Sequence, residues 1–164
     1  SGKRSDLLRQ AAEAMDTALA ASWNGRFSGL PLKSPDELLT LASIVEKETG
    51  KADERPQIAG VFVRRLKKGM RLETDPTVIY GIGEGYDGNI RKKDLQTVTP
   101  YNTYRMHGLP PTPIAMPGRA ALEAAAHPAP GESLFFVATG DGGHVFSATY
   151  EQHRKAVKTY QLKP

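Results

Sequence analysis

The segment LLTLASIVEKET, residues 38–49, carries the clearest pattern in the chain. At about 100° per residue, four of its apolar positions share one face of a helix: Leu38, Leu41, Ala42 and Val45. The next position on that face is Glu48 or Thr49, so a carboxylate can extend a buried stripe. Burial raises the pKa of a carboxyl group, as a general acid working near neutral pH requires. The pattern favours Glu48 over Glu46, although both could be solvated charges at a helix end.

Helix signals continue on both sides of this segment. Ser34 followed by Pro35 predicts an N-cap and a first-turn proline, and Gly50 predicts the end of the same helix. Asp75 before Pro76 is expected to be the N-cap of a brief helix. Further helices are predicted over residues 5–22, 55–68, 118–126 and 150–162.

The remaining segments predict a long loop and a hairpin. From residue 81 to 117 the chain is rich in Gly and Pro, which is typical of an ordered loop with little regular structure. Two strand-like runs, residues 134–138 and 144–148, flank the turn TGDGG. The predicted fold is therefore α+β and mainly helical. It has a small antiparallel β-sheet and a substrate cleft between that sheet and the helix that carries Glu48.

Composition narrows the class of protein. The chain has 164 residues, which is the size of one domain, and its 39% hydrophobic and 24% charged residues are unlike those of disordered chains. Lys and Arg total 22 against 18 for Asp and Glu, an excess too small to indicate nucleic-acid binding by itself. The sequence has no cysteine, which excludes disulfides and thiolate sites, and no run of about 18 apolar residues.

The histidines and basic residues give weaker signals. The four histidines lack the spacing of metal ligands, so neither a metal nor another cofactor is expected, and His127 and His144 are expected to be structural. Basic residues gather between Arg64 and Lys93. A solvated helix end is the usual meaning of such a run, and a nucleic-acid surface is the third interpretation of the chain.

A polar and aromatic loop is a second candidate for ligand binding. Residues 101–104, YNTY, and residues 108–114, GLPPTPI, combine amides, hydroxyls and aromatic rings with a stiff proline frame. Aromatic faces pack on sugar rings and amides bond hydroxyl groups, so this loop suits a groove for a polar, ring-shaped ligand. A proline-braced surface loop without a ligand fits the composition equally well.

Several motifs, in order along the chain, resemble those of one bacterial family. They are LASIVEKE at 41–48, GMRLETDPTVIYG at 69–81, YNTY at 101–104, GLPP at 108–111, AAHP at 125–128 and GGHVF at 142–146. Together they resemble the MltG (YceG-like) family of endolytic murein transglycosylases over most of the chain, from about residue 38 onward. On this resemblance residues 1–33 are expected to be an N-terminal helix and connector, and residues 34–164 a YceG-like catalytic domain.

The resemblance implies a lyase that cleaves the MurNAc–GlcNAc bond inside nascent peptidoglycan strands and leaves 1,6-anhydroMurNAc ends. The family's catalytic glutamate falls in the Glu-Lys-Glu motif, which implies Glu48 as the catalytic residue and Glu46 as the alternative. The substrate-binding residues expected from the matching segments are Glu46, Asp75, Tyr80, Asn102, Thr103 and Tyr104. A non-catalytic peptidoglycan-binding module is the alternative function.

The resemblance also implies a location and partners. The family is anchored in the bacterial inner membrane by an N-terminal helix, with its catalytic domain facing the periplasm or the cell exterior. Residues 1–164 show neither that anchor nor a complete LysM-like subdomain, so they are expected to be the catalytic part. Peptidoglycan strands are the expected substrate, and cooperation with peptidoglycan synthases is suggested.

Overall fold

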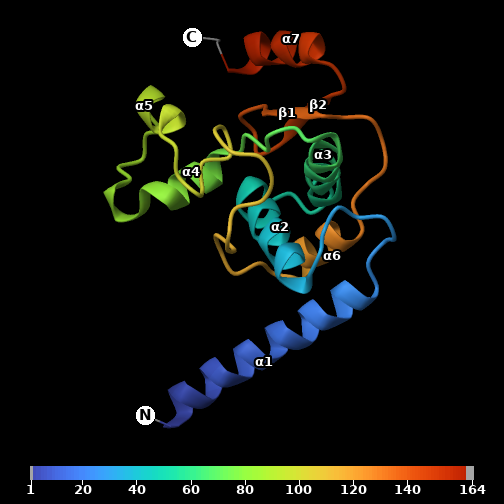
Figure 1. Ribbon diagram of the computed structural model, residues 1–164, viewed down its shortest axis with the longest axis vertical. Helices are drawn as coiled ribbons and strands as arrows, with labels where there is room; N and C mark the ends of the chain where they lie inside the picture. Colours follow the sequence, from blue (N-terminus) through green and yellow to red (C-terminus); the bar gives the residue numbers. More distant parts are fainter. Residues whose placement is uncertain (1, 162–164) are drawn as a thin grey trace.

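The structure, a computed structural model, describes residues 2–161, which form helices and one two-stranded antiparallel sheet (Figure 1). The elements in chain order are α1 (Gly2–Asn24), α2 (Pro35–Glu48), α3 (Arg55–Lys68), α4 (Asp75–Ile82), the 3₁₀ helix η1 (Gly83–Gly85), α5 (Lys92–Gln96), α6 (Arg119–Ala126), β1 (Phe135–Ala138), β2 (His144–Ser147) and α7 (Tyr150–Tyr160). The α+β, mainly helical prediction is confirmed.

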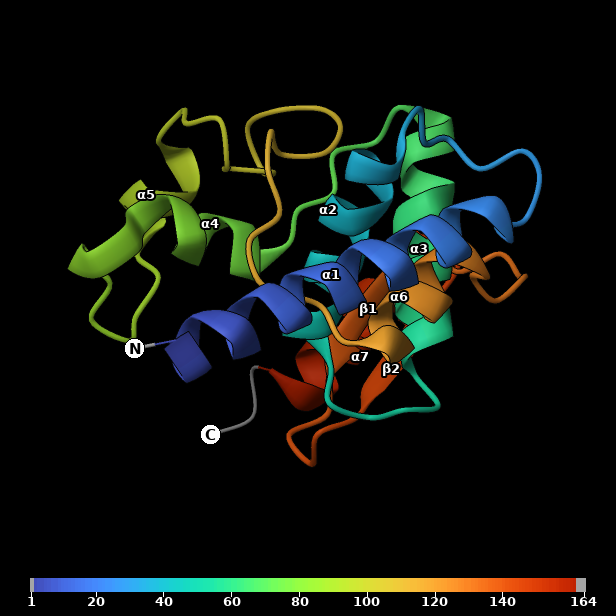
Figure 2. The same cartoon turned by 90° about the horizontal axis from the view of Figure 1, so that it is seen from below.

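Helices α2, α3 and α6 pack against one another and form the core (Figure 2). The stripe predicted on α2 is fully buried, with Leu38, Leu41 and Val45 at 0% exposure. Local signals fix the bounds of this helix as expected. The Ser34 hydroxyl accepts a hydrogen bond from the Glu37 backbone N–H at 3.3 Å, and Pro35 occupies the first turn.

The hairpin lies between α3 and α7. Strands β1 and β2 pair antiparallel, with Phe136 opposite Phe146, as the turn sequence predicted. Phe136 packs edge-on against Phe62 of α3, at 5.7 Å between ring centroids. Helix α7 covers the other face of the hairpin, and its Thr149 N-cap accepts a hydrogen bond from the Gln152 backbone N–H (Figure 1). The hairpin therefore links the core to the C-terminal helix.

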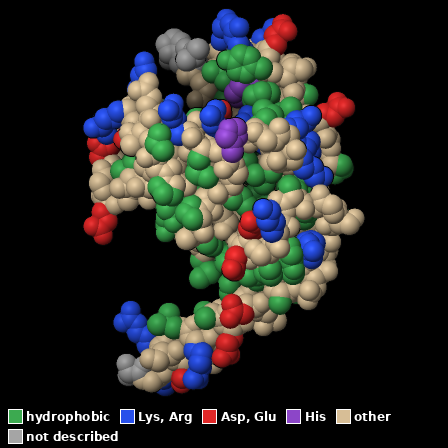
Figure 3. Space-filling view, in the orientation of Figure 1, with side chains coloured by type: hydrophobic (Ala, Val, Ile, Leu, Met, Phe, Trp, Pro, Cys, Tyr) green, Lys and Arg blue, Asp and Glu red, His purple; other side chains and the backbone are tan. Residues whose placement is uncertain are grey.

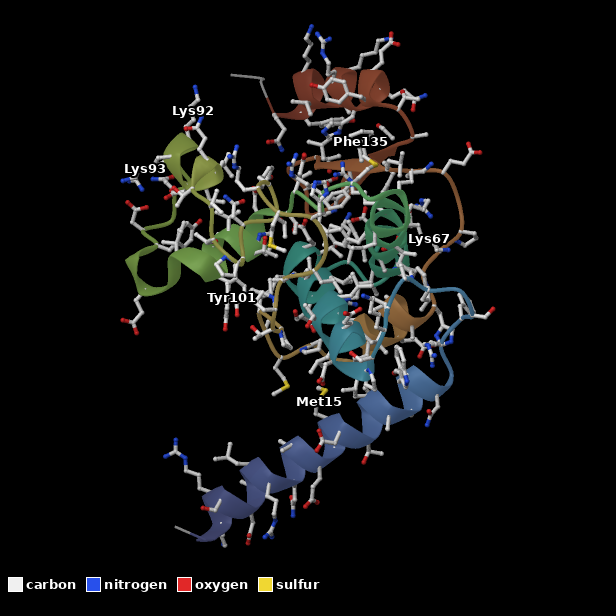
Figure 4. The ribbon with its side chains drawn as sticks, in the orientation of Figure 1. Met15, Lys67, Lys92, Lys93, Tyr101 and Phe135 are labelled. Atoms are coloured by element: carbon white, nitrogen blue, oxygen red, sulfur yellow. The ribbon has the colours of Figure 1, made fainter. Side chains whose placement is uncertain are left out.

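Between α4 and α6 the chain is an ordered loop, as its composition predicted. Its regular structure is limited to η1 and the single turn of α5. Helices α4 and α5 project from one side of the core, and Lys92 and Lys93 of α5 extend outward from it (Figure 4).

Two basic residues of α3 contradict the expectation of a solvated helix end. The Arg64 guanidinium donates to the carbonyl oxygens of Ser133 and Ala129, at 2.7 and 3.1 Å. Arg65 donates to the carbonyl oxygens of Leu134 and Arg71, at 2.6 and 2.7 Å, and is 7% exposed. The segment that enters β1 presents backbone carbonyl groups that need donors, and these two side chains supply them.

Helix α1 extends beyond the body of the protein, and the surface is hollowed between the two (Figures 1 and 3). Its C-terminal half packs on the core through Met15, Ala18, Leu19 and Trp23. The helix predicted over residues 5–22 is confirmed within α1. Leu7 and Leu8 are 66% and 67% exposed, so the apolar side chains of the N-terminal half are not covered by the described part of the body. None of the helices between residues 2 and 161 is long and apolar enough to cross a membrane.

Candidate active site

A pocket of about 370 Å³ lies where the C-terminal end of α2 meets the hairpin and α7. Three carboxylate residues line it: Glu48, Glu73 and Asp75. Four aromatic side chains also line it: Tyr104, Phe135, Phe136 and Tyr150. Phe135 lies on β1 beneath α7 (Figure 4). The pocket thus combines acidic groups with flat apolar faces, a combination suited to a sugar ring.

Glu48 is the last residue of α2 and sits in the wall of this pocket, as the stripe predicted. One of its carboxylate oxygens, Oε2, accepts a hydrogen bond from the Thr74 hydroxyl at 2.8 Å. Burial, the largest influence, raises the pKa of Glu48 to about 7. The Thr74 hydrogen bond lowers it and the charge of Asp75 raises it further. A carboxyl group with this pKa is half protonated at neutral pH and can act as an acid or a base.

Thr74, which contacts this carboxylate, is itself bonded to two further threonines, Thr77 and Thr103. Thr74 is 1% exposed, and its backbone N–H donates to the Thr103 hydroxyl at 2.9 Å. The Thr77 hydroxyl donates to the Thr74 carbonyl oxygen at 2.8 Å and lies 2.9 Å from the Thr103 hydroxyl. Thr77 and Thr103 are completely buried and bond the backbone of Thr74. Thr74, whose hydroxyl contacts Glu48, is therefore held in place. Thr103 therefore acts on the site through Thr74 rather than at the pocket surface.

Asp75 is not the N-cap predicted from the sequence. Thr74 occupies the cap position, and Asp75 is the first residue of α4. The Asp75 carboxylate instead accepts a hydrogen bond from the Tyr104 hydroxyl at 2.6 Å. Burial, followed by the hydrogen bond to Asp75, raises the pKa of Tyr104 well above its usual value, so this hydroxyl stays protonated. A tertiary contact over 29 positions thus replaces the local capping role.

Glu46 faces away from the pocket. Its Oε1 accepts a hydrogen bond from the backbone N–H of Gly118 at 2.6 Å. Gly118 is the N-cap of α6, so this carboxylate ties α2 to the start of α6 and satisfies an amide at a helix N-terminus. The geometry thus separates the two glutamates of the Glu-Lys-Glu motif: Glu48 reaches the pocket, and Glu46 joins two core helices.

Asn102 and Tyr80 also lie apart from the pocket lining. Asn102 is 1% exposed, and its amide nitrogen donates to the carbonyl oxygens of Asp94, Leu95 and Thr97. Tyr80 is 46% exposed and packs against Tyr101, with 4.8 Å between ring centroids. Tyr101 lies on the loop beside α4 (Figure 4). Of the residues expected to bind substrate, the structure brings Asp75 and Tyr104 to Glu48.

The proline-rich loop lines a different hollow. Residues 108–113 and the start of α2 enclose a space of about 600 Å³. Glu48 lies at the other end of α2, which has 14 residues and is therefore about 20 Å long. The two halves of the polar and aromatic loop thus belong to separate surfaces, and only Tyr104 joins the site of Glu48.

Sequence patterns missed several residues of the pocket. Arg65 lines it, stacked over the Phe135 ring at 4.9 Å, because its side chain turns back from α3. His153 stacks on the same ring, with centroids 5.0 Å apart. Glu54 and His144 form a buried pair at its edge. Among the described residues, no cluster of three or more side chains is arranged to hold a metal ion.

Comparisons with known proteins show which family the chain resembles. The model of the YceG-like family matches residues 1–159. An endolytic murein transglycosylase of Bacillus subtilis (strain 168) is 46% identical over 127 residues, or 77% of this chain and 35% of that protein. The enzyme of the same name from Streptococcus pneumoniae serotype 2 (strain D39 / NCTC 7466) is 36% identical over 71% of this chain and 22% of its own length.

A solved structure matches as well. The 2.6 Å crystal structure of a yceG-like protein from Listeria monocytogenes superposes with a TM-score of 0.71 and 46% sequence identity, covering 75% of this chain and 40% of that one. The chain therefore spans about a third of the length of the Bacillus relative and about a fifth of the pneumococcal one.

Proposed function

The chain belongs to the YceG-like family, as its motifs predicted, and on that premise we propose that it is a lytic transglycosylase domain. It cleaves the MurNAc–GlcNAc bond within nascent peptidoglycan strands and leaves 1,6-anhydroMurNAc ends. One observation supports this most strongly: Glu48 presents a half-buried carboxyl group, with its pKa raised to about 7, in the wall of an open pocket. The names of the Bacillus and Streptococcus relatives agree with it.

The mechanism needs one carboxyl group that is acid first and base second. Protonated Glu48 donates its proton to the glycosidic oxygen as the bond to C1 breaks. The N-acetyl carbonyl oxygen of the MurNAc unit that carries C1 stabilises the positive charge that develops there. The C6 hydroxyl then attacks C1 and releases its proton to the Glu48 carboxylate, so no water is consumed. The proton on Glu48 is restored at the end of each cycle.

The neighbours of Glu48 have separate roles in this proposal. Thr74 fixes the direction of the carboxyl group, and the buried Thr103 supports Thr74. Asp75 and Tyr104 bind substrate, because both line the pocket and can exchange their mutual hydrogen bond for one to a sugar hydroxyl. All of these residues belong to residues 34–164, the proposed catalytic domain, while residues 1–33 form the N-terminal helix and connector.

Location and partners follow from the same premise. We propose that the full-length protein is anchored in the inner membrane, with this domain facing the periplasm or the cell exterior. Peptidoglycan strands are the substrate, and synthases that make these strands are candidate partners. The greater length of the relatives leaves room for such an anchor.

The pKa of Glu48 predicts how activity depends on pH. The general acid must be protonated, and with a pKa of about 7 the protonated fraction is large below neutral pH. Above pH 7 we expect the initial rate to fall about tenfold per pH unit. Rates of release of anhydro-ended fragments from murein, measured at several pH values, test this. A rate that is constant or rising up to about pH 9 would contradict the assigned role.

The proposed function is tested by digesting purified murein sacculi with the chain and analysing the products by mass spectrometry. Anhydro-ended fragments support a transglycosylase, and products with a reducing end, formed by adding water, would indicate a hydrolase. A chain that binds the sacculi without releasing fragments would be a glycan-binding module, the alternative function.

A further inference from the structure

A buried contact between Glu54 and His144 joins the start of α3 to the start of β2, and His144 lines the pocket. His144 Nδ1 lies 2.8 Å from Glu54 Oε1, and the His144 backbone N–H donates to Glu54 Oε2 at 3.0 Å. The side chains are 8% and 11% exposed, respectively. Both oxygens of one carboxylate are thus used to hold a single residue in place.

The turn of the hairpin is shaped around this pair. Gly143 lies next to it, and a Cβ atom there would come within 3.3 Å of Glu54 Oε2 and 3.1 Å of Lys51 Nζ. Gly140 and Gly142 adopt φ values of 91°, which side chains disfavour. The absence of a side chain at Gly143 lets the carboxylate reach both the ring and the backbone of His144. Packing of a strand residue would not by itself require a carboxylate that bonds both the ring and the backbone of that residue.

The contact with Glu54 leaves the other ring nitrogen of His144 available. Burial raises the pKa of Glu54, but the hydrogen bonds and charge of His144 together with the charge of Lys51 lower it by more, so the carboxylate is charged and accepts the hydrogen of Nδ1. Nε2, on the other side of the ring, takes no part in this contact. Nε2 forms no hydrogen bond with any of residues 2–161. It is also not among the completely buried polar side-chain atoms of those residues that lack a hydrogen-bond partner. His144 lines the same pocket as Glu48.

We propose that His144 is a substrate-binding residue whose Nε2 forms a hydrogen bond with a sugar hydroxyl of the glycan, and that Glu54 is the positioning residue that orients the ring. This inference rests on the proposed function and extends it to a second wall of the pocket. A carboxylate on the opposite nitrogen is a general means of fixing the orientation of a histidine ring. The edge-on contact with Phe136, at 5.3 Å and 90°, fixes the ring plane as well.

Two substitutions of His144 separate binding from structure. In His144→Asn the side-chain amide takes the position of Nδ1, so the hydrogen bond to Glu54 can persist. The variant has no atom at the position of Nε2, the atom proposed to contact the glycan. In His144→Gln the longer side chain places an amide oxygen near the position of Nε2. We expect His144→Asn to raise KM for soluble, uncrosslinked glycan strands about tenfold with little change in kcat, and His144→Gln to recover part of that loss. Wild-type KM for His144→Asn would overturn the proposal.

A second measurement does not depend on whether His144→Asn folds. In Glu48→Gln protein labelled with ¹⁵N-histidine, we expect saturating glycan strands to shift the Nε2 resonance of His144 and to leave Nδ1 nearly unchanged. An unchanged Nε2 resonance in the bound protein would overturn the role of His144. The proposed function fails separately, if the wild-type chain binds strands but releases no anhydro ends.

Discussion

Glu48→Gln is expected to abolish cleavage of murein while leaving the protein folded. The amide cannot donate a proton to the glycosidic oxygen, and removing a general acid costs about 10² to 10⁴ in rate, or more where no other group can substitute. Asp75, the carboxylate whose charge acts on Glu48, already accepts the Tyr104 hydroxyl and lies on a different element. Release of anhydro-ended fragments by purified Glu48→Gln, relative to wild type, measures the effect.

Stability provides the control for this variant. Glu48 has a pKa of about 7 in the folded protein, above its ordinary value of 4.5, so its burial favours the protonated form. The contribution of this raised pKa to the free energy of unfolding is complete below about pH 4.5. It is lost as the pH rises through 7. A neutral Gln avoids this loss, so at pH 8 the melting temperature of Glu48→Gln should equal or exceed that of wild type.

Glu46→Gln is the matched control on the same helix. Its amide oxygen can still accept the Gly118 N–H, so α2 and α6 stay joined and cleavage should be close to that of wild type. If Glu46→Gln were inactive and Glu48→Gln active, the assignment of the two glutamates would be reversed. Near-normal cleavage by both variants would show that neither glutamate is the general acid.

The sequence predicted most elements because their signals act over a few residues. Ser34 and Pro35 start α2, Gly69 ends α3 in a left-handed conformation with φ of 71°, and the turn before His144 closes the hairpin. The helix predicted over residues 5–22 is confirmed within α1, but a helical pattern gives the direction of an apolar face and not whether another element covers it, so the exposure of Leu7 and Leu8 could not be predicted.

The candidate site was only partly predictable, for a related reason. Glu48 could be identified because it continues a stripe within one helix. Its partner Thr74 is 26 positions away, and His144 is 90 positions from Glu54, so these pairs exist only after the chain has folded. Asp75 shows the same limit: its local pattern indicated a cap, and the distant Tyr104 hydroxyl determines its contact instead.

Asn102 illustrates how a polar residue in a matching motif can be structural. Its amide nitrogen lies 2.7 to 3.1 Å from three backbone carbonyl oxygens, and its Oδ1 accepts the Tyr104 backbone N–H at 2.9 Å. The side chain is 1% exposed, so water cannot replace these bonds without opening the loop. Direct contact with substrate, which the motif suggested, would require that network to break.

Asn102→Ala is therefore expected to lower the free energy of unfolding by about 3 kcal/mol, because four backbone groups lose their bonds to a buried amide, at about 1 kcal/mol each where the groups are partly exposed. For a chain of this size that corresponds to a fall of about 6 to 12 °C in melting temperature. Asn89→Ala, the same substitution at an exposed loop position, is the matched control and should leave the melting temperature nearly unchanged. Thermal melts of both variants, paired with murein digestion, separate the two roles of Asn102. An Asn102→Ala variant as stable as wild type but inactive would restore the substrate-binding role, because the lost amide would then matter only to the glycan.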